Sequence, residues 1–209
     1  MTKPIVVTAT DTDVGKTVFS AGLVRAIDGC YWKPVQAGLD GGTDSETVAR
    51  LSGLPADHIL PEAYRLATPA SPHQAAAIDN VVMEPARLDP PACDRRLVIE
   101  GAGGLLVPLG GGLLFADIFA RWCFETVVVA RTTLGTINHS LLTIEALRRR
   151  NIPILGIAFI GDANEESEHA ISSIGGVRQL GRLPWLDPLD APSLKTAFDA
   201  AFNLADFTP

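Results

Sequence analysis

The chain has 209 residues, of which 47% are hydrophobic and 20% are charged, and its formal net charge is −7. This composition excludes an intrinsically disordered chain, and the length fits one domain better than two. The acidic balance argues against a non-specific surface for nucleic acid or for an anionic membrane. Positive charge for an anionic ligand would therefore have to come from a few local residues, from helix N-termini or from a bound metal.

The three cysteines, Cys30, Cys93 and Cys123, are far apart and share no metal-ligand spacing. Their odd number, together with an N-terminal segment that lacks the pattern of a secretory signal, predicts reduced thiols in a cytoplasmic protein. No apolar run reaches the roughly 18 residues of a membrane-spanning helix. We expect one cytoplasmic domain over residues 1–209, with neither nucleic acid nor membrane as a partner.

Short apolar, β-branched runs alternate with helix-like segments along the chain. They predict strands at 5–9, 31–35, 96–100, 126–130, 153–160 and 177–184, and helices at 16–27, 43–52, 136–150 and 192–204. Nearly continuous apolar strands are typical of parallel strands that are covered on both faces. The order of elements therefore predicts a single-domain α/β fold with a doubly wound, mostly parallel sheet and helices on both faces. The proline-rich stretch 61–91 interrupts the alternation and is expected to be an ordered excursion over the sheet.

The first expected strand is followed by TDTDVGKT, residues 10–17, and then by a helix. Backbone N–H groups at a helix N-terminus bind anions, the lysine of such a loop reaches terminal phosphates, and its threonine hydroxyl ligates Mg²⁺. The segment therefore predicts a phosphate-binding loop in which Lys16 and Thr17 have these roles. Thr10 stands where the ordinary loop has a glycine, five residues before Gly15, which marks a variant loop.

Polar side chains also follow the next two strands. Lys33 is held in extended backbone by Pro34, and it is either a solvated surface lysine or an anion-binding group. Asp44 opens the next helix, where it is either an N-terminal cap or a metal ligand. Glu100 ends an apolar strand, which is where phosphate-loop enzymes place a group facing Mg²⁺. Together with Thr17, these two carboxylates offer three hard oxygen ligands, which suits Mg²⁺.

The fourth strand is followed by a long helix that starts near Thr136. Its free N–H groups are able to bind a carboxylate. His139 in the first turn of this helix is better explained as a packed or capping residue, and the role of His73 stays open.

Six stretches, taken in order, resemble the motifs of the ATP-dependent dethiobiotin synthetases, the penultimate enzymes of biotin synthesis. They are TDTDVGKT (10–17), WKPVQAG (32–38), ASPH (70–73), IEGAGGLLVPL (99–109), TLGTINHSLLT (133–143) and RLPW (182–185). Several independent motifs in the right order are far more specific than the loop alone. The resemblance implies a phosphate-loop NTPase-like fold, Mg²⁺ and ATP, and the conversion of 7,8-diaminopelargonate and CO₂ into dethiobiotin, ADP and phosphate.

In this family one substrate amine captures CO₂ as a carbamate, which attacks the γ-phosphoryl group. The neighbouring amine then opens the resulting carbamic-phosphoric anhydride and closes the cyclic urea. In this chemistry the protein contributes mainly by positioning the substrates and neutralising their charge.

The resemblance also implies roles for individual residues. Lys16 would hold the terminal phosphates, Thr12 would contact them from the loop, and Lys33 would stabilise the carbamate and the developing phosphoryl charge. The nucleotide site would comprise Asp13, Val14, Gly15, Lys16, Thr17, Val18, Glu100, Gly103, Pro184 and Trp185. The Mg²⁺ ligands would be Thr17, Asp44 and Glu100. The substrate site would comprise Ala37, Ser71, Pro72, His73, Thr136, Ile137 and Asn138. The last three lie in a helix start that reaches across a homodimer interface in the family, so a homodimer is implied as well.

The chain departs from the family pattern at two notable places. Ala9 stands where the family usually has a glycine, and alanine would be poorly tolerated if the backbone there had a positive φ. Ile160 or Gly161 stands where many members have an asparagine that reads adenine. Recognition of the base is therefore expected to run through the backbone, through Asn164 or through the segment after LPW.

Two other functions remain as alternatives. A nucleotide-switched, partner-binding ATPase of the partitioning or metal-cluster-assembly type has a similar fold, but those proteins have a lysine early in the loop, where this chain has Thr10. Amidating relatives that act on large corrin acids are the third hypothesis, against which the short chain without an obvious glutaminase segment counts.

Overall fold

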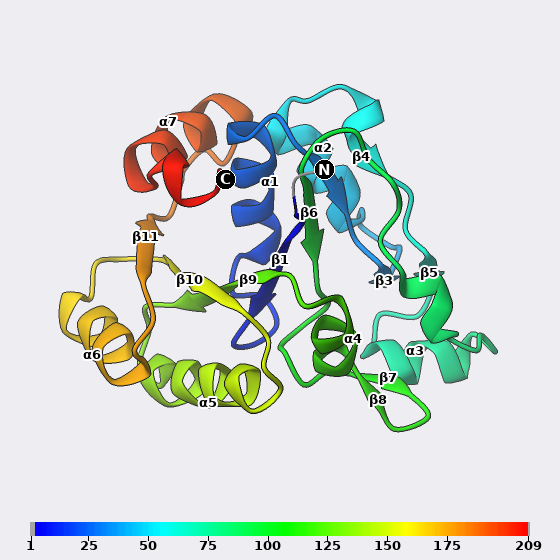
Figure 1. Ribbon diagram of the computed structural model, residues 1–209. Coiled ribbons are helices and arrows are strands. Elements are labelled where there is room, and N and C mark those ends of the chain that lie inside the picture. The colour runs from blue at the N-terminus through cyan, green and yellow to red at the C-terminus, as the bar shows by residue number, and fades with distance from the viewer. Residues whose placement is uncertain (1–2, 209) are drawn as a thin grey trace.

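A seven-stranded parallel sheet forms the centre of the computed structural model, which describes residues 3–208 (Figure 1). The strand order is β11-β10-β9-β1-β6-β2-β4, and all neighbouring pairs run parallel. The strands are β1 (Ile5–Ala9), β2 (Cys30–Trp32), β4 (Ile59–Leu60), β6 (Leu97–Glu100), β9 (Glu125–Arg131), β10 (Ile154–Ile160) and β11 (Gln179–Leu183). The expected doubly wound α/β sheet is confirmed, with β1 near its centre and crossovers to both sides.

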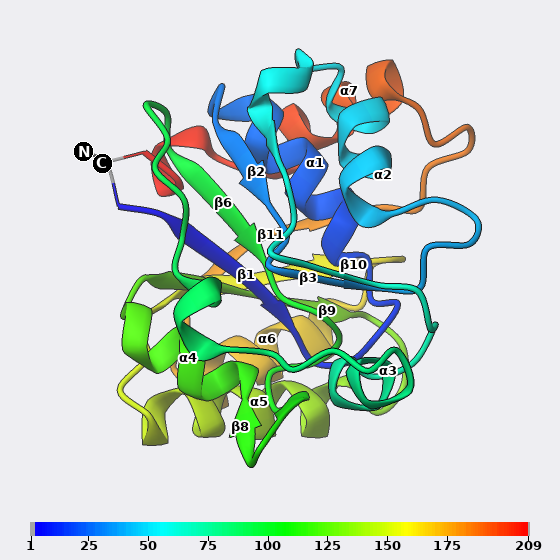
Figure 2. The same ribbon diagram turned by 90° about the vertical axis from the view of Figure 1, so that its right-hand side faces the viewer.

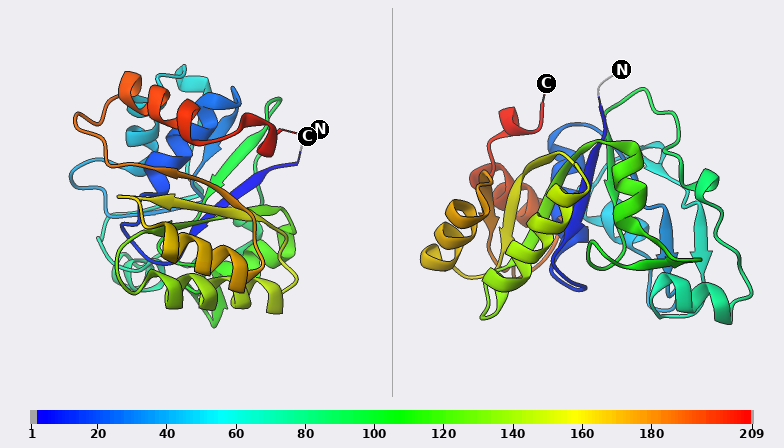
Figure 3. Two further views of the ribbon diagram at one scale, coloured as in Figure 1. Left: turned by 90° about the vertical axis from the view of Figure 1, so that its left-hand side faces the viewer. Right: turned by 60° about the horizontal axis from the view of Figure 1, so that its bottom comes forward.

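Helices cover both faces of the sheet (Figure 2). One face carries α1 (Lys16–Ala26), α2 (Asp44–Ser52) and α7 (Ala191–Ala201). The other face carries α4 (Phe115–Trp122), α5 (Thr136–Arg149) and α6 (Glu165–Gly175), and Figure 3 shows α5 and α6 side by side. Neighbouring residues of β1 belong to different cores, because Val7 is in the cluster that contains Phe19 of α1, whereas Val6 is in the cluster that contains Phe115 of α4. Side chains alternate along a strand, so a continuously apolar strand is buried on both faces.

The proline-rich segment is an excursion with defined secondary structure, as expected. Its strand β5 (Tyr64–Leu66) pairs in parallel with β3 (Val35–Ala37), and α3 (Pro72–Ile78) follows. The remaining elements are the hairpin of β7 (Pro108–Gly110) and β8 (Leu113–Leu114) and the 3-10 helices η1 (Ala56–His58), η2 (Pro85–Leu88) and η3 (Leu204–Asp206). Among residues 3–208, no helix combines the length and apolarity that crossing a bilayer requires.

Two kinds of expectation about the elements were wrong. The strand expected at 31–35 is divided, because Pro34 has no N–H to donate to a strand ladder, so β2 ends at Trp32 and β3 begins at Val35. The helices α3, α4 and α6 and the shortest strands were not expected from the sequence. These helices and strands are short, and most of the stability of short helices in proteins comes from tertiary packing, which an apolar pattern alone does not reveal.

The position of Ala9 causes no strain. It is the last residue of β1 and is fully buried, and the loop's positive φ values fall at Asp13 (53°) and Gly15 (96°) instead. Glycine is required at position 15, since φ is positive and a Cβ would lie 3.1 Å from Ile160 carbons. In this variant loop the left-handed conformation is therefore adopted by Asp13 and Gly15 and not by Ala9.

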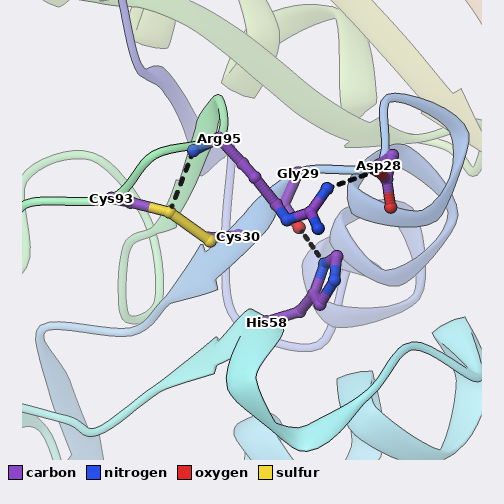
Figure 4. Close-up of a disulfide and its surroundings, with 6 residues drawn as sticks. All are labelled: Asp28, Gly29, Cys30, His58, Cys93 and Arg95. Carbon is purple, nitrogen blue, oxygen red and sulfur yellow. Dashed lines mark hydrogen bonds and ion pairs between the residues drawn. A yellow bond between two sulfur atoms is a disulfide. The ribbon is translucent and has the colours of Figure 1, made fainter.

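Cys30 and Cys93 form a disulfide (Figure 4), so the prediction that all three thiols are reduced was wrong. Cys30 opens β2, and Cys93 lies in the loop that leads into the neighbouring strand β6. The pairing of these two strands brings together cysteines that are 63 residues apart, a separation that carries no pattern in the sequence. Cys123, at the end of α4, is exposed and free.

Candidate active site

A cavity of about 810 Å³ opens beyond the carboxyl ends of the central strands. Its wall is made by the phosphate loop, the segment after β2, the start of α2, the excursion at 69–72 and the segment after β6. Parallel α/β sheets bind their ligands at this edge. The cavity thus lies where the sequence predicts the site.

The phosphate loop leads directly into α1. Gly15 is the N-cap of this helix, and no side chain caps it, so the N–H groups of the first turn remain available to an anion. The side chain of Lys16 is buried and its Nζ donates to the Asp11 carbonyl at 3.1 Å. Burial lowers the pKa of the Lys16 ammonium to about 8, against the opposing effect of Glu100. A phosphate would replace the carbonyl as the partner of this ammonium.

Lys33, Asp44 and Glu100 converge beside the end of this loop. Lys33 Nζ lies 2.6 Å from Asp44 Oδ2 and 3.2 Å from Glu100 Oε1. Burial lowers the pKa of Lys33, but the two carboxylates outweigh it and raise the pKa above its ordinary value. Lys33 is only 3% exposed and is a cation of the cavity wall, so the alternative of a solvated surface lysine is wrong.

Asp44 faces the cavity because the adjacent residue caps α2. The Thr43 hydroxyl accepts from Glu46 N at 3.2 Å, and the Glu46 carboxylate accepts from Thr43 N at 2.7 Å, which is a capping box. The carboxylate of Asp44 is thereby free for other partners. Burial raises its pKa, but Lys33 and the Thr17 hydroxyl outweigh burial and lower the pKa below its ordinary value.

The oxygen donors at this point fit a divalent cation with phosphate. Thr17 Oγ1 lies 3.0 Å from Asp44 Oδ1 and 2.9 Å from Glu100 Oε1, so three hard oxygen donors share one place beside the loop. In the described part of the chain, no three His, Cys, Asp or Glu side chains are grouped to hold a metal. Phosphate oxygens and water would therefore have to complete the coordination, as is usual for Mg²⁺.

The glycine-rich turn after β6 lies close to the phosphate loop. Gly103 has a φ of 62°, and a Cβ there would lie 2.8 Å from Val107 and 3.3 Å from the Thr12 hydroxyl. Only glycine permits this approach without strain. The turn accordingly places Glu100, Gly103 and Thr12 on the same cavity.

Most residues assigned from the resemblance line this cavity, and some do not. Those that line it are Thr12, Asp13, Gly15, Lys16, Thr17, Val18, Lys33, Ala37, Asp44, Ser71, Pro72, Glu100 and Gly103. Val14 is buried in the core beneath the loop, and His73 is exposed with its Nδ1 3.1 Å from Ser71 Oγ.

The residues Thr136, Ile137 and Asn138 lie outside the cavity within a single chain. Thr136 Oγ1 donates to the Arg131 carbonyl at 2.5 Å, and Ile137 and Asn138 are exposed at the start of α5. Thr136 lines a separate hollow of about 140 Å³ on the other side of the phosphate loop, together with the exposed His139. One chain therefore does not bring these three residues, expected at the substrate site, to the other expected substrate residues.

Comparison with known proteins identifies the family. Residues 3–193 match the model of the AAA domain family. The chain is 80% identical over 209 residues to the ATP-dependent dethiobiotin synthetase BioD of Rhizorhabdus wittichii, with 100% of both chains covered. It is 64% identical over 208 residues to the enzyme of that name from Rhodopseudomonas palustris (strain BisB18), again covering 100% of both. The chain belongs to the ATP-dependent dethiobiotin synthetase family.

Solved structures show that the synthetase has the phosphate-loop NTPase fold. A ParA family ATPase from Chlorobium tepidum aligns with a TM-score of 0.55 at 15% identity, covering 99% of this chain and 95% of that one. The cell division ATPase MinD of Pyrococcus furiosus aligns with a TM-score of 0.54 at 12% identity, covering 94% and 95%. At this identity the likeness concerns the fold alone, and the phosphate-loop fold expected from the resemblance is confirmed.

The structure reduces the number of groups that are available to bind the nucleotide base. Asn164 Oδ1 accepts from Ser167 N at 3.2 Å and its Nδ2 donates to the Thr132 carbonyl at 3.1 Å, so its amide is engaged in capping α6. Ile160 is buried beneath Gly15. Pro184 and Trp185 lie outside the cavity, and the indole of Trp185, 59% exposed, is beside Gly161. Of the three routes expected for recognition of the base, backbone groups and the segment after LPW are therefore the two that remain.

Three residues around the site were not expected from the sequence. Tyr31 donates to Glu100 Oε2 at 3.0 Å, and Gln36 Oε1 accepts from Asp44 N at 3.2 Å. Arg131 donates to the Thr12 carbonyl at 3.0 Å. Of these three residues, only Tyr31 had a local signal in the sequence: it lies two residues before Lys33, and β2 ends between them.

Raising the pH from about 7 to about 9 is expected to weaken ADP binding roughly tenfold, because Lys16 has a pKa of about 8 in the free enzyme. A bound phosphate holds the ammonium protonated, so the affinity is complete below this pKa and falls as the pH rises through it. Calorimetric titrations across the pH range measure the effect. The Lys16→Arg variant keeps its charge and should give a flat profile. The same slope in both proteins would contradict the assignment to Lys16.

Proposed function

We propose that this chain closes the ureido ring of dethiobiotin from 7,8-diaminopelargonate and CO₂, with conversion of ATP to ADP and phosphate, as a step of biotin biosynthesis. The observation that carries the proposal is the position of Lys33. Its ammonium is buried in the wall of the cavity that the phosphate loop and the segment with Ser71 and Pro72 also line. A cation at this place serves a reaction in which a carbamate meets a phosphoryl group.

The reaction has three steps. One amine of the substrate adds to CO₂ and loses a proton, which gives a carbamate. A carbamate oxygen then attacks the γ-phosphorus and ADP leaves. Finally the neighbouring amine attacks the carbonyl carbon of the mixed anhydride, phosphate leaves with the bonding electron pair, the attacking nitrogen loses a proton, and the cyclic urea forms.

The chain's own groups act mainly by position and charge. Lys33 neutralises the carbamate and the charge that develops during phosphoryl transfer. Lys16, the N–H groups at the start of α1 and the Thr12 hydroxyl hold the phosphates. The walls formed by Ser71 and Pro72 restrict the diamine, so that both amines stay near the reacting phosphorus.

We also propose a Mg²⁺ site at Thr17, Asp44 and Glu100. The convergence of their oxygens beside the loop supports it. When bound there, the cation neutralises the charge of the phosphates. Since ATP is the co-substrate, we place the reaction in the cytoplasm.

A homodimer would complete the substrate site. The start of α5 exposes the apolar residues Leu134, Ile137 and Leu142, of which Leu134 is fully exposed. These residues adjoin Asn138, which one chain leaves outside the cavity. We propose that a second copy covers this face and brings Asn138 to the carboxylate of the substrate, with the same contact made in return by two-fold symmetry.

Mixing two inactive variants tests this shared site. Lys33→Gln and Asn138→Asp should each be inactive alone, because one removes the cation and the other repels the substrate carboxylate. After unfolding and refolding together in equal amounts, they should regain about a quarter of wild-type turnover, because half of the dimers then have one intact site. A mixture that stays as inactive as its components would contradict a site made by two chains.

The reaction itself is tested by mass spectrometry of the product and by ADP release. With the diamine, bicarbonate, ATP and Mg²⁺, we expect dethiobiotin and ADP in equal amounts. A monoamine of the same length serves as the control, because it has no second nucleophile and cannot give the cyclic product. ADP release that does not respond to the diamine would overturn the proposal, and a co-purifying protein that stimulates it would favour a partner-switched ATPase.

A further inference from the structure

The Glu100 carboxylate is divided between two environments. The residue is 0% exposed at the end of β6. Its Oε1 accepts hydrogen bonds from Thr17 Oγ1 at 2.9 Å and from Lys33 Nζ at 3.2 Å, which are both groups of the cavity. Its Oε2 accepts from the hydroxyl of Tyr31 at 3.0 Å. One oxygen therefore faces the reacting groups and the other faces the interior of the protein.

Tyr31 is placed to act on this carboxylate and not on a ligand. It lies in the middle of β2, next to β6 in the sheet, and is 0% exposed. It does not line the cavity, so its hydroxyl cannot contact the nucleotide or the diamine directly. Its bond to Glu100 therefore joins the interior of the sheet to the oxygen donors of the site.

The hydroxyl gives Glu100 a single orientation. A buried carboxylate oxygen requires a hydrogen-bond donor, and Tyr31 is the donor for Oε2. Without this hydroxyl, Oε2 has no donor, so the carboxylate rotates to bring Oε2 toward the remaining donors, Thr17 and Lys33. Oε1 then leaves its place beside Asp44, where both carboxylates contact the Thr17 hydroxyl. Groups that orient a metal ligand in this way contribute to the affinity of the site for the cation.

We propose that Tyr31 is a positioning residue that holds Glu100 Oε2, so that Oε1 alone faces the divalent cation of the enzyme–nucleotide complex. The inference rests on the proposed Mg²⁺-nucleotide function of the site. It assigns to a core residue of β2 a role in the affinity for the cation.

The Tyr31→Phe variant removes the hydroxyl and keeps the ring. We expect its dissociation constant for Mn²⁺, measured by electron paramagnetic resonance with a non-hydrolysable ATP analogue, to rise by about tenfold or more. The Mg²⁺ concentration for half-maximal turnover should rise in parallel, whereas turnover at saturating Mg²⁺ should change much less. Binding of the analogue without metal should stay unchanged.

Tyr64→Phe is the matched control. Tyr64 is also buried, and its hydroxyl accepts from Glu84 N at 2.7 Å, away from the cavity. This variant loses one buried hydroxyl without touching Glu100, so Mn²⁺ affinity should remain that of the wild type. If both variants lose heat stability but only Tyr31→Phe loses Mn²⁺ affinity, the positioning role stands.

Other outcomes would overturn the proposal. One is unchanged Mn²⁺ affinity in a folded Tyr31→Phe variant, which would make the hydroxyl a contribution to folding alone. Another is an equal loss of metal-free nucleotide binding. Glu100→Gln with and without Tyr31→Phe gives a further check, because a residue that acts through the carboxylate should change Mn²⁺ affinity little in that background, and a loss as large as in the wild-type background would contradict the proposal. These binding assays contain no diamine, so a wild-type enzyme that fails to make dethiobiotin would overturn the proposed function separately.

Discussion

Replacement of Lys33 by glutamine is expected to lower the turnover number by about 10²–10³-fold while ATP affinity changes much less. Lys33 is 3% exposed and lies 2.6 Å from Asp44, so its charge acts in a poorly solvated place where electrostatic effects are large. The carbamate and the transferring phosphoryl group gain negative charge only as the reaction proceeds. A cation held there therefore stabilises the transition state more than the bound nucleotide.

The Lys33→Gln experiment needs a binding and a folding measurement beside the rate. Single-turnover product formation gives the chemical step, and calorimetry with ADP gives nucleotide affinity. Removal of one partner of a buried ion pair costs about 3–5 kcal/mol of folding free energy, so circular dichroism must show that the variant is folded. Lys195→Gln, an exposed lysine of α7 that pairs with Asp199 at 3.0 Å, is the matched control. Equal losses of rate and of nucleotide affinity would argue against the assigned role of Lys33.

Reduction of the Cys30–Cys93 disulfide is expected to lower the free energy of unfolding by about 2–4 kcal/mol. The bond joins residues that are 63 positions apart, and so long a closed loop restricts the unfolded chain strongly. The closed segment contains Lys33, Asp44 and the wall at 69–72. Its loosening should therefore make the site more sensitive to denaturant than the opposite half of the sheet.

Urea unfolding with and without dithiothreitol measures the effect of this bond. The Cys93→Ser variant should unfold at the midpoint of the reduced wild type under both conditions. Cys123→Ser removes the exposed free thiol and should retain the full response to reductant. A wild-type midpoint that does not move with reductant would show that the disulfide does not stabilise the folded chain.

The strand-to-loop pattern predicted much of the site because its signals are local. An apolar strand followed by Gly15, Lys16 and Thr17 at a helix start predicts an anion-binding loop from adjacent residues alone. Lys33 and Glu100 each follow an apolar strand, and parallel strands end at the same edge of the sheet. Their convergence is therefore predictable from the sequence, although the alternatives for Lys33 and Asp44 are not decided by it.

Other features depend on which strands become neighbours. The hydroxyl of Tyr31 reaches Glu100 because β2 pairs with β6, and the same pairing joins Cys30 to Cys93. Asn164 carried the pattern of a polar residue after a strand, yet its amide caps α6. Local sequence gives the kind of side chain, whereas its partner depends on contacts between distant segments.

By itself, the sequence determined the α/β class and the pattern of the phosphate loop, and it predicted Lys33, Asp44 and Glu100 as candidates for the site, because helix starts and strand ends are encoded within a few residues. Only the tertiary structure decided that Thr43 caps α2 and leaves Asp44 to the cavity, that Lys33 is buried between two carboxylates, and that Asn138 lies outside the cavity of its own chain. These outcomes are set by strand order, packing and burial, which are properties of the whole fold and have no local pattern.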